Sequence, residues 1–434
     1  MMHILVVGRG GREHALVWKL AASPEVTRIT AAPGNPGTAL EPKSNNVDIA
    51  VDDIDGLINY AKDNNVDLTV VGPEAPLVLG IADQFRAAGL RIFAPVAAAA
   101  QLEGSKAFAK AFMQKHKIPT AAHATFTDAS EAIAWIKQQG APIVIKADGL
   151  AAGKGVVVAQ TVDEASNAVH AMLGERRFGE ASAKIVVEEF LAGEEASFIA
   201  IVSGTDCLPL ATSQDHKARD EGDLGPNTGG MGAYSPAPVV TETVHAHVVK
   251  DILQPTIDAL SKEGMPFIGF LYVGLMIDST GQARVVEYNV RLGDPETQPL
   301  MMRLESDLLP LLNAAVDGNL PSQHANWHDG SAIGIVLAAG NYPEGSSKGE
   351  TIRGVAAADD SGCKVFHAGT QLLDNELQTA GGRVMCVTAQ AHTLSEAKTL
   401  ADKGAEIVQW KDRRYRRDIG YRAIAREQAV SESS

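Results

Sequence analysis

Three polar side chains in the segment RVVEYNVR, residues 284–291, could bind a metal ion and phosphate oxygens. Apolar and polar residues alternate with the period of two that is typical of a β-strand, which places Val285, Glu287, Asn289 and Arg291 on one face. A carboxylate and an amide oxygen are hard ligands that suit Mg²⁺, and an adjacent guanidinium neutralises anionic oxygens. We therefore predict Glu287 and Asn289 as metal ligands. A half-exposed polar strand face is the alternative.

The glycine-rich stretch KADGLAAGKGV, which begins at Lys146, is a second candidate site. A Walker A loop has four residues between its glycine and the GK pair, continues with Ser or Thr, and opens a helix. Here the flanks PIVIKA and VVVAQT both have strand patterns, so we expect a hairpin loop. Its backbone amides at Gly153 and Gly155, together with Lys154, could cover phosphates as a flap, and a plain tight hairpin is the alternative. Lys146 ends its strand and is the better candidate for a fixed phosphate contact.

The segment VVEEFLAGEEAS, residues 186–197, ends an apolar strand with two glutamates and two apolar residues. Backbone groups at such a strand end can bind an adenine edge while apolar side chains sandwich the ring. Glu195 is placed to accept hydrogen bonds from ribose hydroxyls. An acidic surface turn is the alternative. The remaining nucleotide-binding candidates are Glu188, Glu189, Phe190 and Leu191.

The stretch TSQDHKARDEGDLGPNTGGMGAYSP, residues 212–236, is too long, polar and glycine-rich to be structural filler in a compact domain. We expect a substrate-binding loop in which Asp215, His216 and Lys217 engage a small zwitterion. Amides of NTGGMG, at Thr228 and Gly229, could bind a carboxylate. His216 alone is more often an ordinary polar residue than a catalyst, and we assign it no proton transfer.

The turn GRGGREH, residues 8–14, follows the first predicted strand and resembles a dinucleotide-binding loop. Glu13 occupies the third glycine position of GxGxxG, and no acidic residue closes the next strand, so NAD is disfavoured. Backbone amides at Gly10 and Gly11, with Arg12 beside them, still suit a single phosphate at a helix N-terminus. A tight turn with a surface arginine is the alternative.

Strand and helix patterns divide the chain into several parts. Residues 1–105 alternate β-branched runs with helical patterns, which predicts βαβ units and a parallel, Rossmann-like sheet. Strand-like segments around one helix predict a small α+β lobe at about 120–192. The last hundred residues form a strand-rich region with a closing helix.

Composition limits the function classes. The 434 residues include 38 basic and 53 acidic side chains, and the net charge of -15 disfavours nucleic acid or an anionic membrane as a partner. The three cysteines form no CxxC pair, so neither a zinc site nor a disulfide framework is indicated. Without a signal sequence or a long apolar run, a cytoplasmic protein is expected.

Taken together, these motifs resemble the nucleotide site of the ATP-grasp ligases, where two small α+β lobes clasp ATP. More narrowly, the chain resembles the glycinamide ribonucleotide synthetase family from residue 3 to about 427. The combination of GPNTGGMGAYSP with GDPETQ is the most specific part of this resemblance. Where the family pattern usually has Phe after Arg291, this chain has Leu292, which we expect to alter packing with little effect on chemistry. The other blocks are GRGGREHA, APGNPGT, VGPEAPL, QLEGSKAFAK, IKADGLAAGKGV, EEFLAGEEASF and SQDHK.

The resemblance implies a multidomain α/β and α+β fold. It places a Rossmann-like N-terminal domain, binding the phosphoribosyl substrate, at residues 1–105. A two-lobed ATP-grasp domain with its small flap lobe is expected at 106–325. A small strand-rich C-terminal domain is expected at 326–434.

It also implies a reaction, in which ATP phosphorylates the glycine carboxylate and the amine of 5-phosphoribosylamine attacks the acyl phosphate. The products are glycinamide ribonucleotide, ADP and phosphate, in de novo purine biosynthesis. Charge on the phosphoryl group would be neutralised by Lys106, Lys146, Arg291 and Mg²⁺ (or Mn²⁺). Small-molecule substrates and a monomer are expected. A ligase with another amino acid or ribonucleotide, and a non-catalytic nucleotide sensor, are the alternatives.

The remaining roles rest on analogy with the family. The phosphate of phosphoribosylamine would lie at Gly10, Gly11 and Arg12, with Glu74 near the ribose. Asp294 would orient or deprotonate the amine, so that Arg291 and Asp294 are the catalytic candidates.

Overall fold

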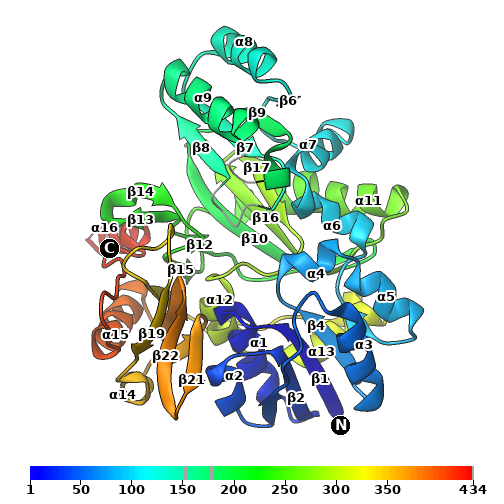
Figure 1. The fold of residues 1–434 in the computed structure, drawn as a ribbon, viewed down its shortest axis with the longest axis vertical. Coiled ribbons are helices and arrows are strands. Elements are labelled where there is room, and N and C mark those ends of the chain that lie inside the picture. Colours follow the sequence, from blue (N-terminus) through cyan, green and yellow to red (C-terminus); the bar gives the residue numbers. More distant parts are fainter. Residues whose placement is uncertain (151–154, 176–178, 433–434) are drawn as a thin grey trace.

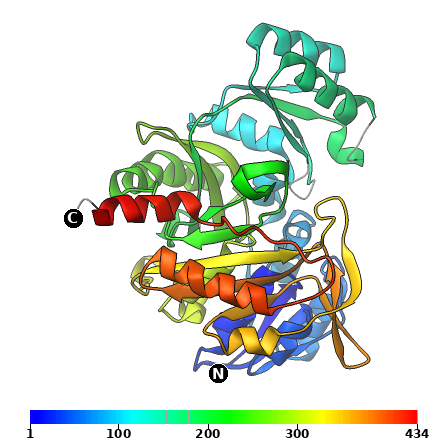
Figure 2. The ribbon, with the colours of Figure 1, turned by 90° about the vertical axis from the view of Figure 1, so that its left-hand side faces the viewer.

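The structure is a computed structural model that describes residues 1–150, 155–175 and 179–432. A small lobe that carries helices α8 (Ala129–Gln139) and α9 (Val162–Val169) projects from a larger body (Figure 1). In a view turned by 90°, the lobe again stands clear of the body (Figure 2). The larger body holds the N-terminal sheet, a central sheet and the C-terminal sheet.

Five parallel strands form the N-terminal sheet, in the order β3-β2-β1-β4-β5. The central strands are continuous apolar runs because the sheet is covered on both faces. The order reverses between β1 and β4, whose carboxyl ends form the switch point where ligands of such sheets bind. The predicted Rossmann-like arrangement is confirmed. The strands are β1 (Met2–Gly8), β2 (Val26–Pro33), β3 (Ser44–Asn46), β4 (Leu68–Val71) and β5 (Ile92–Phe93), and the helices are α1 (Gly11–Ala21), α2 (Pro36–Leu40), α3 (Ile54–Asp63), α4 (Glu74–Val78), α5 (Ile81–Ala87) and α6 (Ala97–Gly104).

The small lobe is an antiparallel four-stranded sheet with two helices against it. Strands β7 and β8 pair across the predicted glycine-rich hairpin, with Lys146 opposite Val156. The lobe has its own apolar core, which shares no buried residue with the cores of the larger body. Its strands are β6 (His123–Phe126), β7 (Ile143–Ala147), β8 (Val156–Ala159) and β9 (Ile185–Glu189), and α7 (Lys106–Lys115), π-helix η1 (His170–Gly174) and 3-10 helix η2 (Gly179–Ser182) also belong to this part of the chain.

The central sheet has the order β11-β10-β16-β17 and is antiparallel. Asp278 Oδ1 accepts hydrogen bonds from the backbone of Thr280 and Gln282 and so closes the turn before β17. The strands are β10 (Glu194–Ser203), β11 (Asp206–Pro209), β16 (Ile268–Ile277) and β17 (Ala283–Asn289), with α10 (Glu242–Val248), η4 (Val249–Leu253) and α11 (Gln254–Lys262) beside them.

The C-terminal sheet, in the order β12-β15-β18-β23-β20, combines strands from two distant parts of the chain. Strands β12 (Gln214–Asp215) and β15 (Gly232–Ser235) lie within the predicted substrate loop and pair with each other, and β15 also pairs with a strand that begins only after residue 330. The boundaries near 105 and 325 stay predictions, and this sheet crosses the second of them. The other strands of this sheet are β18 (Ser331–Ala338), β20 (Lys364–His367) and β23 (Arg383–Ala391).

Smaller elements complete the body. A short hairpin joins β13 to β14, and a three-stranded sheet has the order β19-β22-β21. Within the described ranges, no helix is long and apolar enough to cross a membrane. The elements are β13 (Ala218–Asp220), η3 (Glu221–Asp223), β14 (Leu224–Asn227), α12 (Thr297–Arg303), α13 (Leu308–Val316), η5 (Leu320–Ser322), β19 (Ser347–Thr351), α14 (Val355–Asp359), β21 (Thr370–Leu373), β22 (Glu376–Gly381), α15 (Leu394–Ile407) and α16 (Tyr421–Glu432).

Candidate active site

A cavity of about 740 Å³ is lined by residues of the small lobe and of the N-terminal, central and C-terminal sheets and the loops beside them. Of the predicted site residues, Gly11 does not line the cavity. It packs against Gln298 instead, and a Cβ at Gly11 would lie 2.5 Å from Gln298 Nε2. Gly153 and Lys154, at the predicted flap tip, lie outside the described residues. The predicted residues on the wall are Gly10, Arg12, Glu74, Lys106, Lys146, Gly155, Glu188, Glu189, Phe190, Leu191, Glu195, Asp215, Lys217, Thr228, Gly229, Glu287, Asn289, Arg291 and Asp294.

Strand β17 presents Glu287 and Asn289 to the cavity, and Arg291, two residues after the strand ends, also lines it. The prediction that Val285 shares their face is wrong. Val285 is fully buried in the apolar core. The register shifts between Gly274 and Leu275 of β16, so that Val286 is an extra residue, a β-bulge. The bulge turns the strand so that the polar residues after it face the cavity.

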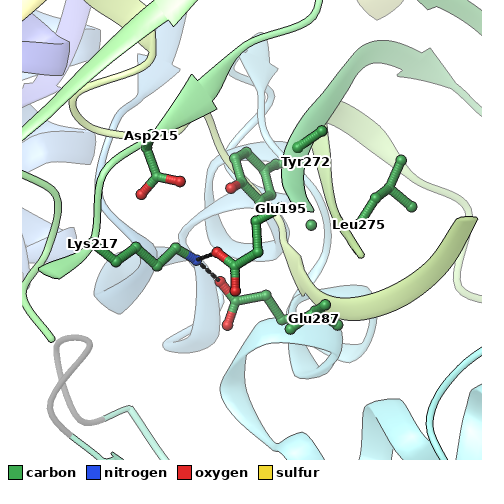
Figure 3. A pocket seen from close by; sticks show the side chains of 9 residues that line it. Glu195, Asp215, Lys217, Tyr272, Leu275 and Glu287 are labelled. Atoms are coloured by element: carbon green, nitrogen blue, oxygen red, sulfur yellow. Dashed lines mark hydrogen bonds and ion pairs between the residues drawn. The ribbon is translucent and has the colours of Figure 1, made fainter. Parts of the chain in front are cut away.

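The Lys217 ammonium lies 3.4 Å from both Glu195 Oε2 and Glu287 Oε1 (Figure 3). Lys217 and the other nearby cations hold the pKa of Glu287 at about 2, although its burial opposes this shift. The Lys217 ammonium therefore already lies between the carboxylates of Glu195 and Glu287. The ionised Glu287 and the Asn289 amide oxygen together form a donor set that suits Mg²⁺. No cluster of three or more His, Cys, Asp and Glu side chains among the described residues could hold a metal. The other ligands of such an ion would be phosphate oxygens and water.

Asp215 lies beside this cluster, on the same small pocket as Tyr272 (Figure 3). Burial raises the pKa of Asp215 to about 8; Lys217 opposes the shift, while Glu296, Glu195 and Glu287 add to it. The neutral acid is therefore the main form at pH 7 in the absence of a ligand. An incoming ammonium group would favour its ionised form.

The expectation that His216 joins Asp215 and Lys217 in binding a zwitterion is not supported by its position. His216 Nε2 accepts a hydrogen bond from Gly420 N at 2.9 Å, and Nδ1 lies 3.5 Å from Asp223 Oδ1. Adjacent residues of a strand point to opposite faces, so His216 points toward the C-terminal segment. Burial lowers the pKa of His216, which is consistent with a neutral, structural imidazole.

Buried lysines form the nucleotide end of the cavity. Glu188 lies 3.0 Å from Lys146 Nζ and 2.9 Å from Lys110 Nζ, and all three side chains are almost fully buried. Lys106 donates to Gly149 O at 3.2 Å, at the base of the hairpin. Burial lowers the pKa of Lys110 to about 8, against the influence of Glu188. Sequence reasoning missed Lys110, although its position one helical turn after Lys106 was a usable signal.

The predicted adenine-binding segment lies at the end of β9. Phe190 is 38% exposed and Leu191 is buried, and both are on the cavity wall. The Glu189 carboxylate points outward to Arg284 at 3.3 Å. The side chain of Glu188 binds lysines, so only its backbone remains for a base edge. An apolar ring sandwich at Phe190 and Leu191 stays a prediction.

Arg291 is held by two carboxylates, from Glu103 at 2.6 Å and from Glu74 at 3.3 Å. Burial raises the pKa of Glu103 to about 7, and Arg291 limits this shift. Glu74 begins α4 after β4, at the switch point of the N-terminal sheet. Sequence reasoning missed Glu103, because nothing local distinguishes it from a surface glutamate.

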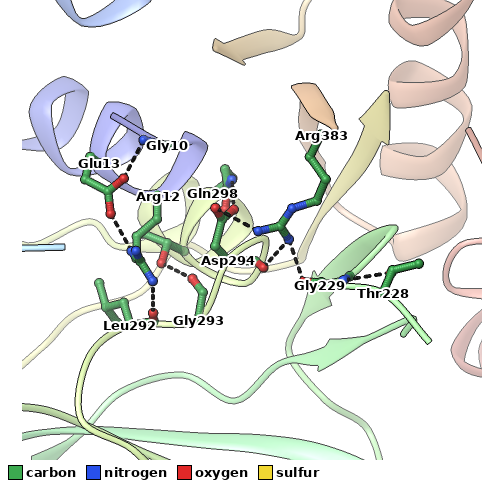
Figure 4. Close-up of polar contacts among 12 residues, drawn as sticks. Gly10, Arg12, Glu13, Thr228, Gly229, Leu292, Gly293, Asp294, Gln298 and Arg383 are labelled. Carbon is green, nitrogen blue, oxygen red and sulfur yellow. Dashed lines mark hydrogen bonds and ion pairs between the residues drawn. The ribbon is translucent and has the colours of Figure 1, made fainter. Parts of the chain in front are cut away.

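The N-terminus of α1 is capped by the side chain of Glu13, a residue of the first turn of the same helix. Glu13 Oε2 accepts from Gly10 N at 2.5 Å, and Glu13 Oε1 accepts from Arg12 Nε at 2.5 Å (Figure 4). Arg12 also donates to Leu292 O at 3.1 Å. A phosphate bound here would meet the Arg12 guanidinium but would compete with Glu13 for the Gly10 amide. The phosphate site at Gly10, Gly11 and Arg12 stays a prediction.

Two residues of the C-terminal region reach the cavity and were missed by sequence reasoning. Arg383 donates to Gly229 O at 2.5 Å, to Asp294 O at 2.5 Å and to Asp294 Oδ2 at 3.2 Å (Figure 4). Tyr342 Oη accepts from Gly229 N at 2.9 Å. Burial alone would raise the pKa of Asp294, but Arg383 and Arg12 hold it below its usual value.

The fold and this arrangement of the site define the class of the protein. Its fold matches the biotin carboxylase domain of Hydrogenobacter thermophilus 2-oxoglutarate carboxylase, with a TM-score of 0.71 and 15% identity. That match covers 96% of this chain and 92% of the other, and shows the fold alone. A family model for an ATP-grasp domain matches residues 104–297. The chain is therefore an ATP-grasp protein.

The family is more specific than this class. The three models that match are the phosphoribosylglycinamide synthetase N domain at residues 2–103, ATP-grasp (A) domain at 104–297 and C domain at 332–422. A Vibrio cholerae phosphoribosylamine–glycine ligase is 56% identical over 428 residues, covering 99% of this chain and 100% of that protein. The one from Xanthomonas campestris is 57% identical, covering 98% and 99%. The chain belongs to the phosphoribosylglycinamide synthetase family, and the predicted resemblance is confirmed.

A solved structure of the same kind agrees with this assignment. The Thermotoga maritima phosphoribosylamine–glycine ligase has a TM-score of 0.81 and 32% identity, over 96% of this chain and 99% of that one. The family likeness therefore extends over the whole architecture.

Proposed function

We propose that the protein joins glycine to 5-phosphoribosylamine, with ATP as the energy source. A glycine carboxylate oxygen attacks the γ-phosphorus, the bond to the β–γ bridging oxygen breaks, and ADP leaves. The amine nitrogen of phosphoribosylamine then attacks the acyl carbon of glycyl phosphate. Phosphate leaves, the nitrogen gives up one proton, and glycinamide ribonucleotide forms.

One observation carries this proposal. A single cavity contains buried lysines for phosphates, a carboxylate–amide pair suited to a divalent cation, and the switch point of a Rossmann-like sheet. Phosphoryl transfer requires mainly positioning and charge neutralisation, and Lys106, Lys146 and Arg291 can provide both. Mg²⁺ or Mn²⁺ on Glu287 and Asn289 would neutralise and orient the phosphates when bound. We also propose that the enzyme acts as a monomer in the cytoplasm.

Glycine fits the end of the cavity near Lys217 and Asp215. Asp215 can pair with the glycine ammonium, and Lys217 can bind its carboxylate, since the Thr228 and Gly229 amides already donate to Lys217 O and Tyr342 Oη. Bringing an ammonium next to Asp215 favours the carboxylate form of that side chain. Glycine binding therefore releases protons from Asp215 at neutral pH.

Asp294 is better suited to orient the amine than to deprotonate it. Its carboxylate is paired with Arg383 at 3.2 Å, and the neighbouring guanidiniums hold the pKa of Asp294 low. A weakly basic carboxylate accepts a proton poorly but can accept a hydrogen bond from an amine N–H. The proton then passes to water or to the departing phosphate.

A coupled ADP-release assay tests the proposed function. Phosphoribosylamine is formed in the assay from ribose 5-phosphate and ammonia, and glycine is compared with alanine and formate. ADP release that needs both glycine and phosphoribosylamine is the expected result. Release with alanine or formate but not with glycine would indicate another carboxylate–amine ligase, and ATP binding without turnover would indicate a nucleotide sensor.

A further inference from the structure

Arg383 lies where the C-terminal sheet meets the cavity. It is the first residue of β23, directly after Gly381 and Gly382, and its side chain is 23% exposed on the cavity wall. A side chain at position 382 would clash with the Tyr342 ring, since its Cβ would lie 2.6 Å from Tyr342 Cδ2. The glycine thus allows Tyr342 and Arg383 to lie near each other at the same edge of the cavity.

The side chains of Tyr342 and Arg383 bind the backbone N–H and the backbone carbonyl of Gly229. Tyr342 Oη accepts from Gly229 N, while Arg383 donates to Gly229 O. A Cβ at Gly229 would lie 3.1 Å from Arg383 Cζ and 3.2 Å from Tyr342 Oη, and Gly230 has a φ of +111°. The turn at Gly229–Gly230 therefore has a conformation that favours glycine and is held in place from the C-terminal region.

The same guanidinium also holds the loop that carries Asp294. It binds Asp294 through both the backbone carbonyl and the carboxylate, so one planar group fixes two loops that are 65 residues apart in sequence. On the far side of Asp294, Gln298 Nε2 donates to Oδ1 at 2.8 Å. The carboxylate is thus fixed at both oxygens.

Hydrogen bonds connect the Gly229 turn to Lys217, and through Lys217 to Glu287. Thr228 N and Oγ1 donate to Lys217 O at 2.8 and 2.9 Å, and Thr228 Oγ1 accepts from Gly230 N at 3.0 Å. The Lys217 side chain in turn contacts Glu287. Displacement of the turn would therefore move Lys217 as well as the amides near the glycine site.

We propose that Arg383 is a positioning residue for the ligation reaction, which holds the Gly229 turn and the Asp294 carboxylate in one fixed arrangement at the substrate end of the cavity. This inference rests on the proposed function and assigns the C-terminal region a direct part in it. Arg383 acts through the groups that it binds and needs no contact with a reacting atom.

Steady-state kinetics of Arg383→Gln in the full chain test the proposal. Misplacing the substrate end by about 1 Å is expected to lower kcat/KM for glycine and for phosphoribosylamine by about 10²-fold. The KM for ATP should stay within threefold of the wild type, because Arg383 touches neither Lys106 nor the Lys146 pair. Arg383→Lys should recover only part of the loss, since an ammonium lacks the planar fork that binds two carbonyls and a carboxylate.

Arg413→Gln is the matched control. The Arg413 guanidinium also binds two backbone carbonyls, those of Ala405 and Val408, but both lie in the C-terminal region and outside the cavity. This variant should melt at a lower temperature with every KM within twofold of the wild type. Tyr342→Phe, which frees only Gly229 N, should change KM for glycine in the same direction as Arg383→Gln, by about fivefold.

Three results would overturn the proposal. Wild-type kinetics in Arg383→Gln, within twofold for all three substrates, would show that the contacts are incidental. A purely structural role would be shown if Arg383→Gln lost kcat/KM equally for ATP and for the other two substrates, and also melted at a temperature lowered as much as that of Arg413→Gln. If the wild type releases no ADP that depends on glycine and phosphoribosylamine, the proposed function fails and the inference fails with it.

Discussion

The nucleotide end and the substrate end of the cavity are stabilised in different ways. At the nucleotide end, a lobe with its own apolar core contributes Lys146 and Glu188, and its link to the body includes Lys110. At the substrate end, Arg12 from helix α1 and Arg383 from the C-terminal sheet both bind the loop at Leu292–Asp294. A lobe with a separate core can move without unpacking its neighbours. The comparison shows a nucleotide end built partly on a separately packed lobe, and a substrate end held by groups from two parts of the larger body.

The largest loss is expected at Glu287, where the two ends meet. Glu287→Ala removes the ionised carboxylate that we propose binds the metal, and should lower metal-dependent turnover by about 10³-fold or more without unfolding the protein. The coupled ADP assay measures turnover, and circular dichroism checks the fold. Full activity in this variant would show that the metal site was assigned to the wrong strand.

Variants of two lysines test whether the buried Lys146 contributes more to catalysis than Lys154, at the predicted tip of the hairpin. Lys146→Ala should lower kcat/KM for ATP by about 10²-fold, because it removes a buried positive charge from the phosphates. Lys154→Ala should cost less. Parallel steady-state kinetics of both variants give the ranking, and a larger loss for Lys154→Ala would reverse our view of the nucleotide end.

Asp215 provides a pH-dependent test of the substrate end. Its pKa is about 8 in the folded protein and about 3.8 when unfolded, so its favourable contribution to stability, complete below pH 4, is lost as the pH rises toward 8. Asp215→Asn should therefore melt roughly 2–5 °C above the wild type at pH 8, with the difference vanishing near pH 4. The same variant should bind glycine about tenfold more weakly.

Melting curves from pH 4 to 9 and glycine titrations measure these two effects. Titrations in buffers of different ionisation enthalpy also report the proton that Asp215 releases when glycine binds. A melting difference that does not change with pH would contradict the raised pKa of Asp215.

The smallest effect on kinetics is expected at Leu292. Its side chain is buried in the apolar core, and Arg12 binds only its backbone carbonyl. Leu292→Phe, which introduces the residue that the family resemblance predicts here, should cost about 1–3 kcal/mol by overpacking while kcat and KM stay within twofold. Denaturant unfolding and steady-state kinetics measure the two quantities, and a tenfold change in KM would mean that the core side chain controls the loop.

Residues of the nucleotide end could be predicted from the sequence more fully than those of the substrate end, and the reason is physical. Strand alternation and glycine-rich spacing are local, so Glu287, Asn289 and the hairpin after Lys146 could be predicted from short windows. The bulge at Val286 could not, because a register shift depends on the partner strand. Arg383, Tyr342 and Glu103 act only through contacts with residues far away in sequence, and no local pattern marks them.

The C-terminal sheet, which combines strands from two distant parts of the chain, has a consequence for how the chain folds during synthesis. Strand β15, after the substrate loop, pairs on one side with β12 and on the other with β18, which begins at Ser331. A growing chain is synthesised from its N-terminus, so β15 remains an open edge until about a hundred further residues have emerged. A nascent chain can form its N-terminal sheet early, but β15, which pairs with the strand that carries Asp215, gains its second partner only after β18 has been synthesised. Completion of this edge of the sheet therefore depends on residues that are synthesised well after the substrate loop.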